Sequence, residues 1–286
     1  MKLSVVILTM GNRPDELGRA VESTVPLRSA GAEVIVVGNG ADVPVQPDGV
    51  SVLRLAENAG VSGGRNAAVR ECSGDVVLFL DDDGWYPDPA GLGEHVPARF
   101  AAEPRLAVLS FRVADPDGGG SARWHVPRLR AGDPERSSVV TTFAGGACAI
   151  RRSAFEEAGG FPDAFFFGHE ETDLSWRLLE MGYRIEYDAA AVMCHPPARN
   201  ARHESWYRLE ARNRVWLARR NLPWPLAAVY LADWVALTLA RERSKEARRA
   251  WFGGFAEGWK SDAGRRQPIS LRTAWTMTRA GRPPVI

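Results

Sequence analysis

The sequence predicts an α/β fold, in which a doubly wound, mainly parallel sheet carries helices on both faces and is followed by a helical C-terminal extension. Two observations support this fold class. Apolar, β-branched runs alternate with helical patterns over the first part of the chain, as in doubly wound sheets. Seven of the ten tryptophans lie after residue 198, among dense arginines and with a helical period.

Four strands are predicted in the first 80 residues, from short runs rich in valine, isoleucine and leucine. Continuous apolar runs of this kind are typical of strands buried on both faces. They cover residues 3–9, 33–37, 51–55 and 75–80. The second run is ended by Gly38-Asn39-Gly40, and the fourth leads directly into Asp81-Asp82-Asp83.

Two helices are predicted between these strands. Pro14 suits the first turn of a helix that runs to about residue 24. Ser62 is expected to cap a second helix, which carries Arg65 and Asn66. A polar stretch rich in glycine, proline and aspartate, residues 114–138, is expected to be a surface loop.

The segment after this loop carries further signals. Residues 139–150 are apolar but contain Gly145-Gly146, which indicates that the backbone approaches another group closely. The remaining elements follow in order: a short helix with a capping-box pattern at Ser153 and Glu156, ended by Gly159-Gly160; a helix over residues 170–181, ended by Gly182; and one or two strands within residues 183–194.

Composition indicates an ordinary soluble globular protein. The 286 residues are 45% hydrophobic and 25% charged, and the net charge of +1 gives no global field that favours nucleic acid. The three cysteines, Cys72, Cys148 and Cys194, form no C-x-x-C pair, which argues against a disulfide framework and fits a reducing, cytosolic setting. The apolar run at residues 3–10 is too short to cross a membrane and lacks a signal-peptide cleavage site.

The acidic triplet is the strongest chemical signal. Ligands of open α/β sheets bind at the carboxyl ends of the strands, where Asp81, Asp82 and Asp83 are expected to lie. Adjacent carboxylates in apolar surroundings repel one another, and a divalent cation relieves that cost. Oxygen ligands suit Mg²⁺ or Mn²⁺, which also binds a substrate diphosphate. The alternative is a solvated acidic turn.

A second acidic cluster, Glu170-Glu171-Thr172-Asp173, stands at a predicted helix start. Carboxylates at such a position gain from the helix dipole, which is the purely structural interpretation. The cluster follows Phe165-Phe166-Phe167, however, and apolar surroundings raise the pKa of a carboxyl toward that of a general base. We therefore expect a proton acceptor among these acids.

Two further candidates depend on their neighbours. Arg65 lies near a helix start, where it could contact a phosphate, or it is an ordinary surface arginine. His195 follows a predicted strand and is either structural or a nitrogen ligand to an aspartate-bound metal. Cys148 and Cys194 are expected in the core. The remaining histidines, His95, His125 and His203, are assigned to structure or surface.

Five motifs in order resemble those of bacterial family-2 glycosyltransferases, closest to the rhamnosyltransferase-like enzymes of envelope and polysaccharide assembly. They are residues 5–13, 58–66, 75–83, 145–161 and 168–177. The resemblance covers roughly residues 3–200. Each motif alone is weakly specific, whereas the ordered set is highly specific.

The resemblance implies a GT-A fold and an inverting displacement on a nucleotide-diphosphate sugar. The family's aspartate-x-aspartate motif maps onto Asp81 and Asp83, with His195 as a further metal ligand. Glu171 matches the family's base. The implied nucleotide contacts are Thr9, Asn12, Arg13, Asn39, Arg65, Asp81 and Asp82. The other acids of the second cluster, Glu170 and Asp173, are the alternatives to Glu171.

The chain departs from the family pattern at two places. Gly38 stands where the family usually has an aspartate that recognises the nucleotide base, so Asn39 or Asp42 would have to substitute. The family's Glu-Asp pair is Glu170-Glu171 here, which moves the proton-accepting oxygen outward by one methylene.

Residues 1–200 are predicted to form the catalytic domain, and residues 201–286 a helical extension rich in arginine and tryptophan. The extension is expected to pack on the catalytic domain. The alternative is peripheral contact with the inner face of the cytoplasmic membrane, where arginines would hold a lipid phosphate. The arginines concerned are Arg199, Arg202, Arg208, Arg212, Arg214, Arg219 and Arg220.

The expected acceptor is a hydroxyl group of a glycan, a polyprenyl-linked saccharide or a small molecule. Two other functions fit parts of the pattern. A sugar-phosphate nucleotidyltransferase would carry a glycine-rich phosphate loop after the first strand, and residues 9–14 are too poor in glycine for that. A non-catalytic sugar-nucleotide-binding scaffold would have lost its acids, whereas both clusters are present.

Overall fold

The computed structural model describes residues 1–117, 126–129, 133–196 and 203–286. Several predictions fall outside these residues: part of the loop at 114–138, His125, Arg199, Arg202 and the domain boundary at residue 200. The division into two domains therefore stays a prediction.

An eight-stranded sheet forms the centre of the fold, in the order β3-β2-β1-β4-β7-β5-β8-β6. The strands β3, β2, β1 and β4 run parallel to one another, as do β5 and β8, while β7 is antiparallel to β4 and β5, and β6 is antiparallel to β8. The mainly parallel sheet is thus confirmed. The strands are β1 (Leu3–Thr9), β2 (Glu33–Asn39), β3 (Val50–Leu55), β4 (Val76–Asp81), β5 (Leu106–Ala114), β6 (Ser138–Val139), β7 (Ala147–Arg151) and β8 (Arg184–Cys194).

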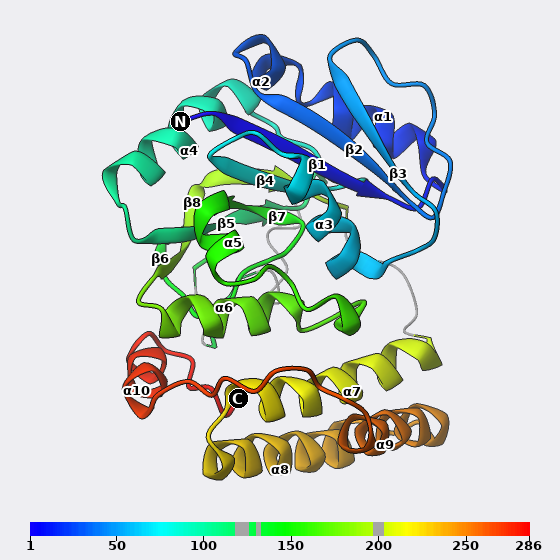
Figure 1. Cartoon of the computed structure of the whole chain (residues 1–286), viewed down its shortest axis with the longest axis vertical. Coiled ribbons are helices and arrows are strands. Elements are labelled where there is room, and N and C mark those ends of the chain that lie inside the picture. The colour runs from blue at the N-terminus through cyan, green and yellow to red at the C-terminus, as the bar shows by residue number, and fades with distance from the viewer. Residues whose placement is uncertain (118–125, 130–132, 197–202) are drawn as a thin grey trace.

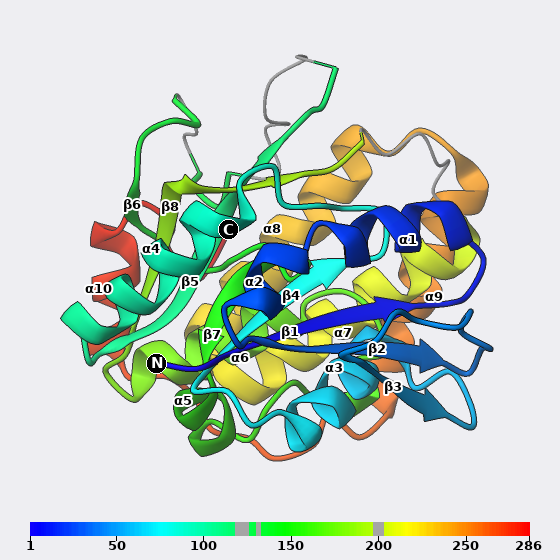
Figure 2. The same cartoon turned by 90° about the horizontal axis from the view of Figure 1, so that it is seen from above.

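Helices cover both faces of the sheet because successive strand residues point to opposite sides. Val5 and Ile7 of β1 join a core with one set of helices, and Val6 joins a core with the other. Figures 1 and 2 show the two layers. The first set is α1 (Pro14–Glu22), α2 (Val25–Ser29) and α4 (Pro89–Ala102); the second is α3 (Gly60–Glu71), α5 (Arg152–Glu157) and α6 (Glu170–Glu180).

Both predicted N-caps are wrong. Helix α3 begins at Gly60, so Ser62 is buried inside its first turn. Its first residue must be glycine, because Gly60 has a φ of +71° and a Cβ atom on it would lie 2.3 Å from the Phe166 carbonyl oxygen. Helix α5 begins at Arg152, directly after β7, and no side chain caps it. This leaves Ser153 within the helix, where the capping box cannot form.

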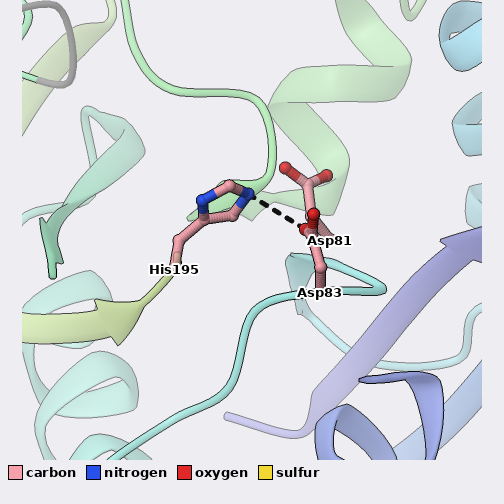
Figure 3. A group of neighbouring side chains, drawn as sticks. All are labelled: Asp81, Asp83 and His195. Atoms are coloured by element: carbon pink, nitrogen blue, oxygen red, sulfur yellow. Dashed lines mark ion pairs between the residues drawn. The ribbon is translucent and has the colours of Figure 1, made fainter. Parts of the chain in front are cut away.

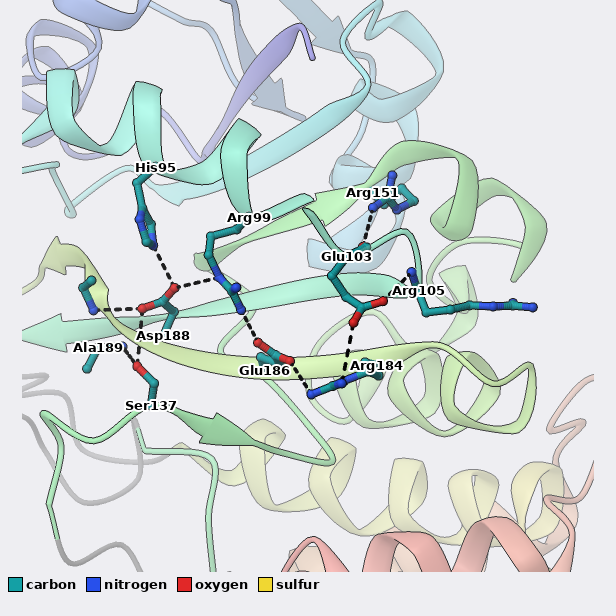
Figure 4. Close-up of polar contacts among 11 residues, drawn as sticks. His95, Arg99, Glu103, Arg105, Ser137, Arg151, Arg184, Glu186, Asp188 and Ala189 are labelled. Atoms are coloured by element: carbon teal, nitrogen blue, oxygen red, sulfur yellow. Dashed lines mark hydrogen bonds and ion pairs between the residues drawn. The ribbon is translucent and has the colours of Figure 1, made fainter. Parts of the chain in front are cut away.

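A polar network fastens α4 to β8 (Figure 4). His95 lies 2.8 Å from Asp188, and Arg99 contacts Glu186 at 2.5 Å. Arg184 pairs with the same Glu186 at 2.7 Å. His95 therefore has a structural role, as predicted. The network holds β8 in place, and β8 leads directly to His195.

The C-terminal helices form a third layer beside α6 (Figure 1). They are α7 (Glu204–Asn221), α8 (Trp224–Arg241), α9 (Lys245–Lys260) and α10 (Leu271–Arg279). Phe165 and Trp176 join their core, so the layer packs directly on the loop and helix of the second acidic cluster. Among the described residues, no helix combines the length and apolar character needed to cross a bilayer.

The arginines of α7 that the structure describes make internal contacts. Arg212 donates to the carbonyl oxygens of Ala164 and Phe165. Arg220 donates to Asp173, which also accepts from Arg177 and Asn221. The remaining three bind groups of α7 and α9 or the residue after α9: Arg208 to Glu257, Arg214 to Glu210, and Arg219 to the carbonyls of Gly258 and Ser261. These contacts support the packing interpretation of the extension.

We predict that Asp173→Asn destabilises the protein by about 3–5 kcal/mol at pH 7, because two buried guanidinium groups lose their counter-charge. Although burial opposes ionisation, Arg177 and Arg220 lower the pKa of Asp173 in the folded state. The contribution of Asp173 to the free energy of unfolding is therefore complete above pH ~3.9, the pKa of aspartate in the unfolded chain, and it is lost as the pH falls through the lower pKa of the folded state.

Urea unfolding of both proteins between pH 7 and pH 3 measures this difference. The exposed Glu156→Gln, which removes the partner of Arg152 at the surface, is the control and should change the free energy of unfolding little. A stability difference for Asp173→Asn that stays constant over the whole pH range would contradict the ion-pair account.

Candidate functional site

A cleft opens at the carboxyl ends of β1, β2 and β4, as expected for an open α/β sheet. It has two connected parts, which share Val61, Arg65, Asp81 and Phe167. One part, here called the nucleotide groove, runs past the loop after β1. The other, here called the acid pocket, contains Glu170, Glu171 and His195.

Asp81, Asp83 and His195 form a group whose ligand atoms all lie within 4.8 Å of one another (Figure 3). Trp85 and Cys194 exchange backbone hydrogen bonds of 3.0 and 2.8 Å, which bring the end of β8 beside the acidic triplet. His195 Nε2 consequently lies 2.9 Å from Asp83 Oδ1. The sequence-predicted metal ligands therefore converge.

The charges in this group are balanced by neighbouring cations. Although burial opposes ionisation, the hydrogen bond from His195 and its charge lower the pKa of Asp83, and Arg13 contributes in the same direction. The hydrogen bond to Asp83 raises the pKa of His195. Two carboxylates and an imidazole are a donor set that suits Mn²⁺ or Mg²⁺, so the residues fit the expected cation.

Asp82 points away from this group and into the loop after β1. Its carboxylate accepts a hydrogen bond of 2.7 Å from Thr9 Oγ1 and lies 3.5 Å from Arg13. Burial raises the pKa of Asp82, although the bond from Thr9 opposes this. Thr9, Asn12, Arg13 and Asp82 all line the nucleotide groove.

The guanidinium of Arg65 links the two acidic clusters. It is 5% exposed, donates to Asp81 at 3.0 Å and lies 3.9 Å from Glu171. Burial opposes its charge, but the carboxylates of Asp81, Glu171 and Glu170 raise the pKa of Arg65. One of its nitrogens, Nη1, is buried without a hydrogen-bond partner among the described residues. It is the nitrogen that lies 3.9 Å from Glu171 Oε1.

The adjacent acids of α6 have raised pKa values. Burial raises the pKa of Glu171, while Arg65 opposes the shift. Burial and the charge of Glu171 raise the pKa of Glu170, whose Oε2 atom has no hydrogen-bond partner among the described residues. A carboxyl group with a raised pKa is suited to accept a proton near neutral pH.

Gly145 and Gly146 leave room for these carboxylates. A Cβ atom on Gly146 would lie 1.9 Å from Oδ2 of Asp81, and one on Gly145 would lie 2.2 Å from Oε1 of Glu171. The close approach predicted for this glycine pair is thus confirmed. The pair lies at the start of β7, which runs next to β4.

The loop that carries the second cluster is held in a strained conformation. Phe166 and His169 have positive φ angles of 64° and 70°, which are uncommon for residues other than glycine. The amide nitrogen of Asn213 in α7 lies 2.8–2.9 Å from the carbonyl oxygens of Phe165, Phe167 and Gly168. Helix α7 therefore fixes the position of Glu170 and Glu171.

Asp173 does not face the cleft, and its proposal as an alternative base is corrected. Its side chain is fully buried, and both oxygens are used by Arg177, Arg220 and Asn221. These contacts hold its charge and lower its pKa, which is the opposite of what a base near neutral pH requires.

Asn39 lines the groove but uses its amide to hold the neighbouring loop. It donates to Asn58 and to the Gly60 carbonyl, and accepts from the Ala59 backbone N–H at 2.9 Å. His203 and Trp206 of the α7 start also line the groove and were not predicted. Only the whole fold brings that segment to the cleft, so no local pattern marks it.

Two protein families match the chain. The model for glycosyl transferase family 2 matches residues 4–159, and the model for the N-terminal domain of galactosyltransferase matches residues 129–194. The two matches together span all of the site residues predicted from the sequence except His195, which lies one residue beyond the second match.

Several curated proteins are similar. The pre-mycofactocin glycosyltransferase of Mycobacterium tuberculosis is 30% identical over 66% of this chain, which spans 42% of that protein's length. An uncharacterised glycosyltransferase of Bacillus subtilis, YwdF, is 36% identical over 65% of the chain and 70% of its own length. The N-acetylglucosaminyl-diphospho-decaprenol L-rhamnosyltransferase of M. tuberculosis is 28% identical over 52% of the chain and 56% of its own.

Solved structures share the fold. GalNAc-T7 with UDP, GalNAc and Mn²⁺ has a TM-score of 0.62 at 16% identity, covering 92% of this chain and 56% of that one. The mannosyltransferase PcManGT of Pyrobaculum calidifontis with GDP-Man and Mn²⁺ has a TM-score of 0.59 at 20% identity, covering 97% and 84%. The GT-A fold and the family resemblance predicted from the sequence are confirmed: the chain belongs to glycosyl transferase family 2.

Proposed function

We propose that the protein is an inverting glycosyltransferase that moves a sugar from a nucleotide diphosphate to an acceptor hydroxyl. One observation carries the proposal: two acidic clusters from distant parts of the chain meet across the buried guanidinium of Arg65, at one end of an open groove. The first cluster has the chemistry of a cation site, and the second has the chemistry of a proton acceptor.

Asp81, Asp83 and His195 would hold Mn²⁺ or Mg²⁺, as their donor atoms and mutual distances suit. When bound, the cation neutralises charge on the donor diphosphate and stabilises the leaving group. Arg65 is placed to contact the donor because it lines both the nucleotide groove and the acid pocket. Thr9, Asn12, Arg13, Asn39 and Asp82 line the groove that would receive the nucleotide.

Glu171 is the base in this proposal. Its carboxylate lines the acid pocket, and Arg65 and Gly145 lie against it. It takes the proton of the acceptor hydroxyl as the oxygen attacks the anomeric carbon, on the side opposite the leaving nucleotide, which inverts the configuration. Glu170 lies beside it, and burial together with the charge of Glu171 raises the pKa of Glu170 to about 8.

The donor base and sugar are left open. Gly38 replaces the usual aspartate, and the solved structures with this fold hold UDP in one case and GDP-Man in the other. The acceptor is a hydroxyl of a glycan, a polyprenyl-linked saccharide or a small molecule. A decaprenyl-linked acceptor in the name of one relative favours the lipid-linked class.

We place the reaction in the cytoplasm and keep peripheral contact with the inner membrane face as the alternative to an extension that only packs on the catalytic domain. All three cysteines are free, which suits a reducing compartment. Trp224, Trp259 and Trp275 are exposed on the C-terminal helices, and such side chains favour the membrane interface.

Glu171→Gln is expected to lower the rate of sugar transfer or donor hydrolysis at least ~100-fold, because a general base is lost. Glu170→Gln should cost less. The acid limb of the wild-type pH–rate profile should lie above the ordinary glutamate pKa of ~4.3, in keeping with the raised pKa of Glu171. Nucleoside diphosphate released from UDP-, GDP- and dTDP-sugars provides the assay.

Glu71→Gln, at the exposed end of α3, is the matched control and should leave the rate unchanged. Donor binding by the Glu171 variant, measured separately, shows that the protein is folded. If Glu171→Gln retains near-normal turnover, or if Glu170→Gln is the more damaging change, Glu171 is not the base.

Gly146→Ala is expected to reduce activity at least ~10-fold, because the added methyl displaces the Asp81 carboxylate and any group that it holds. Gly253→Ala in α9 is the control, since nothing lies within 4 Å of an added Cβ atom there. Steady-state rates and melting temperatures of both variants give the comparison. Full activity in a folded Gly146 variant would show that the position of Asp81 is not critical.

A further inference from the structure

A separate pocket, here called the C-terminal pocket, lies between α6, α7, α8 and the last residues of the chain. His169, Arg214, Arg282 and Trp234 line it, and none of these residues lines the nucleotide groove or the acid pocket. The catalytic mechanism proposed above does not use it.

Two arginines, Arg214 and Arg282, line this pocket, and none of the described aspartates or glutamates does. Glu210, beside the pocket, pairs with Arg214 at 2.5 Å and lies 3.2 Å from His169 Nε2. Arg282 has no carboxylate within ion-pair distance among the residues that the structure describes. Burial lowers the pKa of Arg282, and the charge of Arg214 adds to this. The guanidinium therefore lacks an anion.

Two nitrogen atoms around the pocket, Arg214 Nε and Trp234 Nε1, are also buried without a hydrogen-bond acceptor among the residues that the structure describes. The guanidinium of Arg214 stacks on Trp234, with its central carbon 3.3 Å from the ring centroid, so these two nitrogens lie close together. A buried donor without an acceptor costs about 1–3 kcal/mol, and such donors usually mark a missing partner.

We propose that the C-terminal pocket binds a small oxyanion, a phosphate or a carboxylate group, through Arg282, Arg214 and Trp234. An oxyanion supplies the acceptor atoms that the donors lack and the negative charge that Arg282 lacks. The group belongs either to the acceptor substrate or to a free metabolite. In both cases it would contact Thr172, which directly follows Glu171 and also lines the pocket.

Titration calorimetry of the full chain with inorganic phosphate, in the absence of any sugar donor, tests the proposal. Wild type should bind one phosphate saturably. Arg282→Gln should bind at least ~10-fold more weakly, since a charge-assisted contact is lost. Trp234→Phe keeps the aromatic surface but removes one donor, and should weaken binding severalfold. Arg279→Gln, an exposed arginine of α10 outside the pocket, should bind like wild type.

Failure of phosphate to bind folded wild type, or equal binding by Arg282→Gln and wild type, would overturn the proposal. Because no donor is present, this result is independent of whether the protein transfers sugars. Activity assays then separate the two sources. If phosphate competes with the acceptor and leaves the rate of donor hydrolysis unchanged, the oxyanion belongs to the acceptor. If phosphate changes the rate of donor hydrolysis in wild type and not in Arg282→Gln, the oxyanion is a free metabolite.

Discussion

The buried guanidinium of Arg65 is the constraint on which the site depends. It stands between Asp81 at the end of β4 and Glu171 at the start of α6, two carboxylates that would otherwise repel each other in a desolvated cleft. Its own desolvation is offset only while both acids stay close. The guanidinium of Arg65 therefore holds the two acidic clusters at a fixed separation. A reaction between a bound donor and an activated hydroxyl requires such a separation.

Other parts of the fold serve the same end. The absence of side chains at Gly145 and Gly146 lets the backbone of β7 approach Asp81 and Glu171. Helix α7 holds the strained loop before α6 through Asn213, and Asp173 anchors α6 to α7 through charged contacts. The C-terminal helices thus belong to the framework that holds the candidate site, in keeping with the inward contacts of their arginines and with the two positive φ angles in the loop.

Sequence patterns were sufficient for the fold and for the chemical character of both clusters. Strand runs and the placement of Asp81–Asp83 after β4 follow from local periodicity and from the rule for sheet ends. The role of Asp173 could not be predicted from the sequence, because its partner Arg220 is 47 residues away. An acid at a helix start gives the same local pattern whether it is a catalytic base or a structural ion-pair partner. The sequence also did not predict that His203 and Trp206 line the groove, since long-range packing alone brings α7 there. The two wrong N-cap predictions show that a serine near a helix start does not by itself fix where the helix begins. Helix α3 begins at Gly60, where the backbone lies close to Phe166.

The central claim is that the group around Asp83 and the groove beside it form a cation-dependent donor site. Thermal unfolding with UDP-, dTDP- and GDP-sugars, with and without Mn²⁺, tests this most directly, in wild type and in Asp83→Asn. A ligand that binds only the folded state raises its stability by mass action. The account predicts a rise in melting temperature with one nucleotide family, dependent on Mn²⁺ and lost in Asp83→Asn. No shift with any donor in a folded protein, or a shift that the variant keeps, would contradict it.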